Sequence, residues 1–208
     1  GPGAAKKMKT KITFDDGRTF EPVRAGDKEI HLHSVTELNN VGRVFSSPAP
    51  GLVMGNGNRG EHLKSYKEAN LYVSDDAGKT WIKALEGPHK YEFGDQGSVL
   101  VAVRDIVDHK SEDTVSEVKY SLNHGQDWKT ITLPNKLKIQ PWVLTTTQDS
   151  SSLKFILTGK TPGKSPKFHL ISIDFEGLHE DTCKDSDMED WYARKDDKGD
   201  PQCLMGHT

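Results

Sequence analysis

The sequence predicts an all-β protein made of β-propeller blades, and two observations support this prediction. Short apolar runs alternate with polar, glycine-containing turns along most of the chain, which is typical of antiparallel hairpins. One turn pattern, S-x-D-x-G-x-T-W, lies at residues 74–81 and recurs in modified form at residues 13–20 and 121–128. The copies start 61 and then 47 residues apart, which is close to the length of one four-stranded blade.

The central copy, which begins at Ser74, explains why these residue types are suited to a turn. A short acceptor such as Asp76 can bond backbone N–H groups of its own turn, and Gly78 permits a positive φ angle. Trp81 then starts the next strand as a large apolar anchor. We interpret the motif as a hairpin-building element and not as a reactive one. It resembles the Asp-box of sialidase-type and related propellers.

The three copies define a set of predicted structural residues. Phe20, Asn123 and Asp127 depart from the consensus but keep its spacing. The predicted Asp-box residues are Thr13, Asp15, Gly17, Thr19 and Phe20, then Ser74, Asp76, Gly78, Thr80 and Trp81, and finally Ser121, Asn123, Gly125 and Trp128.

Further strands are predicted on both sides of these turns. The nearly continuous apolar run at residues 98–103 is interpreted as the innermost strand of a blade, packed on both faces. The expected strands are 9–14, 21–23, 30–33, 51–54, 71–74, 81–85, 91–93, 98–103, 115–121, 128–133, 142–147, 153–158 and 168–175.

The composition limits the classes of partner. The formal net charge is -3, with 33% hydrophobic and 28% charged residues, which is typical of a polar globular β protein. Such a balance does not predict binding to nucleic acid or to an anionic membrane. No apolar run approaches the roughly 18 to 20 residues of a membrane span, so we expect this piece itself not to cross a bilayer.

The two ends of the chain differ from its middle. Residues 1–5 have the character of a cleavage and cloning remnant and are set aside. Beyond residue 177 the chain is acidic and contains its only cysteines, Cys183 and Cys203. Their spacing fits neither a zinc ribbon nor a C-x-x-C pair, so we interpret residues 178–208 as the irregular start of a disulfide-rich module.

Three patterns could indicate a metal or cofactor site, and we expect none of them to do so. His31 and His33 share one face of a strand, but no third ligand lies nearby, and we expect a solvent-facing pair. Residues 55–60 read G-x-G-x-x-G, yet no helix or βαβ unit follows, so we expect a loop between two strands. The aspartates at 15–16 and 75–76 and in the acidic tail offer too few ligands for calcium. No cofactor is predicted.

The order of these features resembles the sortilin family of sorting receptors, particularly its fungal vacuolar members. The residues that carry the resemblance are 12–15, 71–81, 85–89, 99–103, 118–128, 173–175, Cys183 and 203–206. The resemblance implies a ten-bladed propeller whose tunnel holds peptide ligands, followed by cysteine-rich modules, a membrane span and a cytosolic tail. Residues 6–177 would be the last three to four blades. Cys183 and Cys203 would pair with cysteines further downstream.

The resemblance implies that the chain is a lumenal, cargo-binding part of a receptor that carries soluble hydrolases from the Golgi to the endosome or vacuole. Its expected partners are peptide or protein cargo, such as vacuolar hydrolase propeptides, and the remaining blades of the same receptor. No ligand-binding residue is assigned. The alternative is a sialidase-like glycoside hydrolase, which would need an arginine cluster and an acid/base pair. Only six arginines occur, and the turns account for Asp15 and Asp76, so no catalytic residue is predicted.

Overall fold

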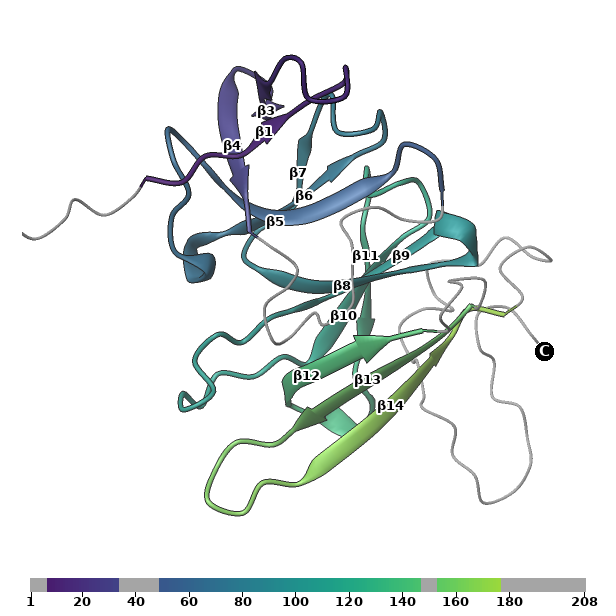
Figure 1. Ribbon diagram of the computed structural model, residues 1–208. Coiled ribbons are helices and arrows are strands. Elements are labelled where there is room, and N and C mark those ends of the chain that lie inside the picture. The colour runs from purple at the N-terminus through teal and green to yellow at the C-terminus, as the bar shows by residue number, and fades with distance from the viewer. Residues whose placement is uncertain (1–6, 34–48, 147–152, 177–208) are drawn as a thin grey trace, which may run out of the picture. The chain divides into compact units, whose positions relative to one another are not determined.

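The computed structural model describes residues 7–33, 49–146 and 153–176 (Figure 1). These residues form fourteen β-strands and three short 3-10 helices, and they contain no α-helix. None of the described helices is long and apolar enough to span a membrane. The prediction of an all-β chain is therefore confirmed. The chain divides into two compact units, residues 1–89 and 90–208, which are described one at a time.

The first unit contains a two-stranded ladder and a larger antiparallel sheet. Its five-stranded sheet runs in the order β3-β4-β5-β6-β7, so each strand pairs with its neighbour in sequence. Four consecutive antiparallel strands, β4 to β7, are the arrangement of a propeller blade. The elements are β1 (Lys11–Ile12), β2 (Glu21–Pro22), β3 (Arg24–Ala25), β4 (Lys28–Leu32), β5 (Val53–Arg59), η1 (Tyr66–Glu68), β6 (Asn70–Ser74) and β7 (Ile82–Leu85).

The second unit contains two antiparallel sheets. One has the order β11-β10-β9-β8 and the other the order β12-β13-β14. The elements are β8 (His89–Gly94), η2 (Asp95–Gly97), β9 (Val99–Arg104), β10 (Glu117–Ser121), β11 (Lys129–Thr132), η3 (Pro134–Lys136), β12 (Gln140–Thr145), β13 (Lys154–Lys160) and β14 (Phe168–Asp174). The predicted turns lie between β1 and β2, between β6 and β7, and between β10 and β11.

The position of the long apolar run differs from the prediction. Residues 99–103 of β9 are all buried, as expected for a strand packed on both faces. However, β9 lies between β8 and β10 in its sheet and is not the edge strand. The prediction of an innermost strand was therefore wrong, because an interior strand of a blade is also covered on both faces and carries the same apolar pattern.

The glycine-rich run at residues 55–60 is not a loop. Most of it belongs to β5, whose residues 54–58 are buried. A Cβ atom on Gly57 would lie 2.9 Å from the carbonyl oxygen of His31, so the close approach of β4 requires glycine at this position. Asn58 accepts hydrogen bonds at Oδ1 from the Lys64 N–H and pairs there with His33 Nε2 at 2.7 Å. A polar run can therefore form a buried strand, because its amide side chain is hydrogen-bonded.

The core of the second unit joins its two sheets. Aromatic rings lie at its centre: Phe175 is 5.3 Å from Tyr120 and 5.6 Å from Phe155, measured between ring centroids. The ring pairs have the tilted and edge-to-face geometry that aromatic side chains prefer. The core consists of Val99, Val101, Val103, Ile106, Val115, Val118, Tyr120, Ile131, Leu133, Ile139, Leu144, Phe155, Leu157, Ile171, Ile173 and Phe175.

A buried ion pair also lies in the second unit. The ammonium group of Lys90 is 3.3 Å from a carboxylate oxygen of Asp105, and both side chains are almost completely inaccessible to solvent. Lys90 belongs to β8, and Asp105 directly follows β9. The pair joins the start of β8 to the end of β9, and removal of either partner would leave an uncompensated charge in the interior.

We expect Lys90→Met to lower the free energy of unfolding by about 3–5 kcal/mol, because it removes the cation that neutralises the buried Asp105 carboxylate. Chemical denaturation would measure the change. The matched control is Lys154→Met, since Lys154 is 54% exposed and pairs with Glu176 at the surface. The control should cost less than about 1 kcal/mol. Equal losses in the two variants would contradict a special role for the buried pair.

Candidate functional site

The three predicted turns share one backbone conformation. Each turn begins with a Ser or Thr acceptor. The third and fourth residues after it have positive φ angles, and the fourth is glycine. The left-handed region is costly for most residues and readily adopted by glycine. The φ angles are 57° and 83° for Asp16 and Gly17, 62° and 84° for Ala77 and Gly78, and 57° and 77° for His124 and Gly125.

Side-chain hydrogen bonds hold the second turn closed. Ser74 Oγ accepts from the N–H of Gly78 at 2.9 Å, and its hydroxyl donates to Asp76 at 2.7 Å. Asp76 accepts from both the N–H and the hydroxyl of Thr80, at 2.8 and 2.5 Å. The indole N–H of Trp81 donates to the carbonyl of Gly78 at 2.9 Å. The polar side chains at the four consensus positions, Ser74, Asp76, Thr80 and Trp81, are therefore used within their own turn.

The third turn replaces the acidic residue without losing the network. The N–H of Asp127 donates to Asn123 Oδ1 at 2.9 Å, where the second turn uses a carboxylate. The amide group of Asn123 then donates to the Asp127 carboxylate at 2.7 Å. The bond between the two side chains is reversed relative to that of Asp76 and Thr80, whereas the backbone bond keeps its direction. Trp128 Nε1 repeats the bond to a glycine carbonyl at 3.0 Å.

The first turn keeps the polar bonds and lacks the indole. Asp15 accepts from the N–H and the hydroxyl of Thr19, at 2.8 and 2.6 Å. Thr13 Oγ1 accepts from the N–H of Gly17 at 2.9 Å. Phe20, in the position of the tryptophans, has no N–H to donate and is 57% exposed. The closure of this turn therefore rests on its hydroxyl and carboxylate groups.

The hydrogen bonds of the turns favour ionised carboxylates. The Thr19 hydroxyl and N–H hold the pKa of Asp15 below its usual value. Burial by itself would raise the pKa of Asp76, but the hydrogen bonds from Thr80 and Ser74 together outweigh it and lower that pKa to about 2. Because the folded-state pKa is depressed, the stabilisation by Asp76 is present above pH 4, roughly, and is lost as the pH falls towards 2.

We expect Asp76→Asn to lower the free energy of unfolding by about 1 kcal/mol at neutral pH, because the charge-assisted bonds to Thr80 are weakened. Denaturant titrations at neutral and strongly acidic pH would measure the effect. The difference from the unsubstituted chain should shrink as the pH falls below 4 or so, where the native carboxylate takes up its proton.

The third turn supplies a matched rescue for this variant. The double substitution Asp76→Asn with Thr80→Asp reproduces the Asn123 and Asp127 pair and should recover most of the lost stability at neutral pH. Asp75→Asn, which alters the adjacent carboxylate outside the network, serves as the negative control. A double variant no more stable than Asp76→Asn alone would show that the two turns are not equivalent.

The two histidines at positions 31 and 33 are not a solvent-facing pair. His31 is completely buried, and its two ring nitrogens lie within hydrogen-bond distance of Thr10 N and Gly60 O. His33 is half-buried and bonds Asn58. The prediction was wrong because the segment before β1 and the end of β5 cover the face that was expected to be open. Among the described residues, no group of three or more His, Cys, Asp or Glu is placed to hold a metal ion.

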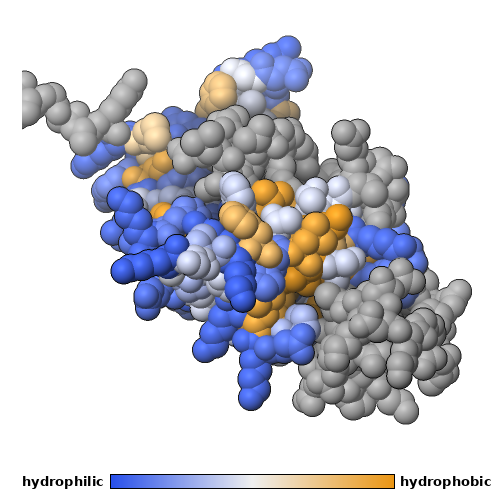
Figure 2. All heavy atoms as spheres, turned by 90° about the horizontal axis from the view of Figure 1, so that it is seen from below, coloured by the Kyte–Doolittle hydropathy of each residue, from blue (hydrophilic) through white to orange (hydrophobic). Residues whose placement is uncertain are grey.

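An exposed apolar face is the clearest candidate for a binding surface. It lies on the sheet β12–β14, whose opposite side belongs to the core of the second unit. In the view of Figure 2, hydrophobic side chains gather in one exposed patch. Phe168 and Leu170 are each 67% exposed and Trp142 is 54% exposed. We call the set Trp142, Val143, Ile156, Phe168 and Leu170 the apolar face.

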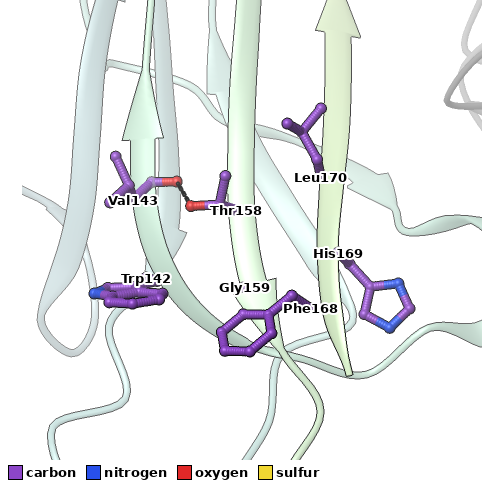
Figure 3. Close-up of a pocket in the computed structure, with 7 residues that line it drawn as sticks. All are labelled: Trp142, Val143, Thr158, Gly159, Phe168, His169 and Leu170. Atoms are coloured by element: carbon purple, nitrogen blue, oxygen red, sulfur yellow. Dashed lines mark hydrogen bonds between the residues drawn. The ribbon is translucent and has the colours of Figure 1, made fainter. Parts of the chain in front are cut away.

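A shallow cavity of about 460 Å³ lies in the apolar face. Trp142 and Phe168 are among the residues that line it (Figure 3), and their ring centroids are 5.9 Å apart. Thr158 Oγ1 donates to the Val143 carbonyl at 3.4 Å, so its polar group is directed to the backbone. The cavity can therefore bind an apolar side chain but offers little to a charged one.

Sequence reasoning missed the apolar face, although β14 carries a signal for it. Successive side chains of a strand point to opposite faces, and β14 is apolar on both of them. Ile171 and Ile173 are buried in the core, whereas Phe168 and Leu170 lie on the other face and are exposed. A strand that is apolar on both faces indicates a sheet that other parts of a protein cover on both sides.

We expect the isolated chain to self-associate through the apolar face, because an exposed apolar patch of this kind favours contact with another surface. Light scattering as a function of protein concentration would measure the association. Leu170→Asp should shift it towards monomer. Leu122→Asp, at a 44% exposed leucine in the third turn, is the control and should leave the association unchanged. A concentration-independent monomer for the unsubstituted chain would contradict the prediction.

The four-stranded sheet β8–β11 and the four consecutive strands β4–β7, each with an Asp-box-like turn between its last two strands, define this chain as a set of β-propeller blades. A family model described as sortilin, neurotensin receptor 3, matches residues 1–144, and the model of its C-terminal part matches residues 146–208. The chain belongs to the sortilin/Vps10 family. This confirms the resemblance seen in the sequence.

Fungal relatives match nearly the whole chain. The vacuolar protein sorting/targeting protein 10 of Pyricularia oryzae is 68% identical over 98% of the chain. The proteins of the same name from Neurospora crassa and Talaromyces marneffei are 66% and 58% identical, over 100% and 98% of the chain. The chain spans only 13% of the length of each of these three relatives.

Proposed function

We propose that the chain is a cargo-binding part of a sorting receptor that carries soluble hydrolases from the Golgi to the endosome or vacuole. The observation that carries this proposal is the similarity, at 66 to 68% identity over at least 98% of the chain, to proteins named for vacuolar protein sorting and targeting. The proposed cargo is a peptide or protein such as the propeptide of a vacuolar hydrolase. The chain would face the lumen of Golgi and endosomal membranes, within a single-pass receptor.

We further propose that this part of the receptor binds without catalysis. A sialidase-like hydrolase needs several arginines around a substrate carboxylate. Two of the described arginines have structural partners instead: Arg24 donates to the Asp27 carbonyl and Arg59 to the Ala25 carbonyl. The carboxylates of Asp15 and Asp76 are engaged in their turns. These contacts favour a binding module over the glycoside hydrolase alternative.

The proposed partner of the apolar face is another propeller blade of the same receptor. Each blade in a propeller packs between two neighbours, so a sheet that is apolar on both faces fits this position. Most of the length of the relatives lies outside this chain, which supports a partner elsewhere in the polypeptide. Residues 6–177 would then be the last three to four blades.

Residues 178–208 are proposed to begin a cysteine-rich module. These residues lie within the match of residues 146–208 to the C-terminal family model. Cys183 and Cys203 lie outside the described residues, as do residues 1–5. We propose that the two cysteines pair with cysteines further along the receptor.

The proposed function is tested by calorimetric titration of the complete lumenal part of the receptor with the propeptide of a vacuolar hydrolase at neutral pH. We expect saturable binding to the propeptide and none to a peptide of the same composition in scrambled order. A neuraminidase assay on the same preparation should give no turnover. Turnover of a sialoside without propeptide binding would favour the hydrolase alternative.

A further inference from the structure

A second cavity, of about 230 Å³, lies in the second unit and differs from the cavity of the apolar face because most of its lining residues are polar. Three parts of the chain form it: the loop between β9 and β10, the start of β12, and the end of β13 with the turn that follows. We call it the polar cavity. Its lining includes Lys110, Glu112, Gln140, Lys160, Pro162 and Pro166.

Hydrogen bonds of their own hold the two loops that border the polar cavity. In the loop between β9 and β10, the Ser111 hydroxyl donates to the Asp108 carbonyl at 2.7 Å. In the turn between β13 and β14, the N–H of Thr161 donates to the Lys167 carbonyl, and the N–H of Lys167 donates to Thr161 Oγ1, both at 2.9 Å. The polar cavity is therefore formed by the fold itself, as ligand sites usually are.

Gln140, at the start of β12, is only 1% exposed, and its amide group is fixed in one orientation. Its Nε2 donates to the carbonyls of Ser111 and Asp113, at 2.7 and 3.3 Å. Because a carbonyl can only accept, these contacts identify the NH₂ end of the amide and leave Oε1 at the other end. Oε1 is buried, and no group in the described part of the chain donates to it. A buried acceptor without a donor costs free energy, so the residues of the polar cavity include an unused acceptor.

Charged side chains of both signs belong to the lining of the polar cavity. Lys110 and Glu112 come from the loop between β9 and β10, and Lys160 is the last residue of β13. Within residues 7–33, 49–146 and 153–176, none of these three side chains has an ion-pair or hydrogen-bond partner. The two ammonium groups can donate, whereas the carboxylate and Gln140 Oε1 can accept. The polar cavity therefore offers free donors and free acceptors together.

We propose that the polar cavity binds a sugar unit of a carbohydrate. Each sugar hydroxyl both donates and accepts, so neighbouring hydroxyls can donate to Gln140 Oε1 and accept from Lys160 at the same time. An anion would meet the Glu112 carboxylate and a cation would meet two ammonium groups, so the mixed charges favour a neutral ligand. Pro162 and Pro166 add apolar rings that can contact the C–H groups of the sugar. This inference is independent of the proposed cargo function.

The size of the polar cavity limits the ligand. Its volume of about 230 Å³ is smaller than the roughly 300–1,000 Å³ of pockets that hold drug-sized molecules, so we assign one sugar unit to it. The unit can belong to a free saccharide or to the glycan of a glycoprotein, because both present the same hydroxyl groups. A glycopeptide, compared with the same peptide without its glycan, distinguishes these two sources.

The proposal is tested by NMR titration of the whole chain with the methyl glycosides of glucose, galactose, mannose and N-acetylglucosamine, each used separately. The probes are the side-chain NH₂ signals of Gln140 and the backbone amides of Lys160 and Thr161. We expect at least one glycoside to shift them saturably, with half-saturation at about 1–10 mM, because a single sugar unit makes few contacts. Inorganic phosphate and methylammonium, titrated in the same way, should leave the signals unchanged.

Two results of these titrations would overturn the proposal. One is a saturable response to phosphate or methylammonium without a response to any glycoside, which would show that the polar cavity selects a charge. The other is the absence of a response to every glycoside up to about 100 mM, which would show that the polar cavity holds water only.

Three variants connect the response to the polar cavity. Lys160→Met removes an ammonium donor and should weaken glycoside binding at least about fivefold. Gln140→Met removes Oε1 and should abolish binding, and unchanged backbone amide signals outside the polar cavity would show that the fold persists. Lys154→Met is the matched control, because Lys154 lies on the same strand but pairs with Glu176, and it should leave the affinity unchanged. Equal affinities of the Lys160→Met and Lys154→Met variants would refute the proposed site.

Discussion

The turns of this protein depend on one constraint, which is that two consecutive residues adopt a left-handed conformation directly after a short polar side chain. Such a backbone leaves the N–H groups at the far side of the turn without partners from a strand ladder. Ser74 and Asp76 supply those partners at distances below 3.0 Å, and the bonds recur in the other two turns. The strands on either side are brought into antiparallel register by this closure, and the register determines which residues enter the core.

The residues of the turns could be predicted from the sequence because the side-chain hydrogen bonds that close them span at most four residues. The acceptor, the glycine and the partner four positions further on all lie in one short window, so the spacing alone specifies the network. Most of the strands followed from these turns and from the apolar runs between them, although β3 was not predicted.

Features that depend on distant partners could not be predicted. The burial of His31 results from Thr10 and Gly60, which lie 21 and 29 residues away. The strand β5 was mistaken for a loop because its glycines and asparagines are unusual in strands, and the reason for Gly57 is the approach of a neighbouring backbone. The apolar face could not be predicted for the same reason, because an apolar residue in a strand does not reveal which surface will cover it.

The reversed side-chain bond between Asn123 and Asp127 bears on how such turns can change during evolution. A turn with Asp and Thr and a turn with Asn and Asp each carry one negative charge at these two positions, so the interconversion moves the charge by four residues. Two single steps lead from one to the other. An intermediate with Asp at both positions would place like charges against each other. An intermediate with Asn at the first position and Thr at the second keeps a neutral hydrogen bond. The neutral intermediate is the route by which a lineage could relocate the charge while the hairpin stays closed.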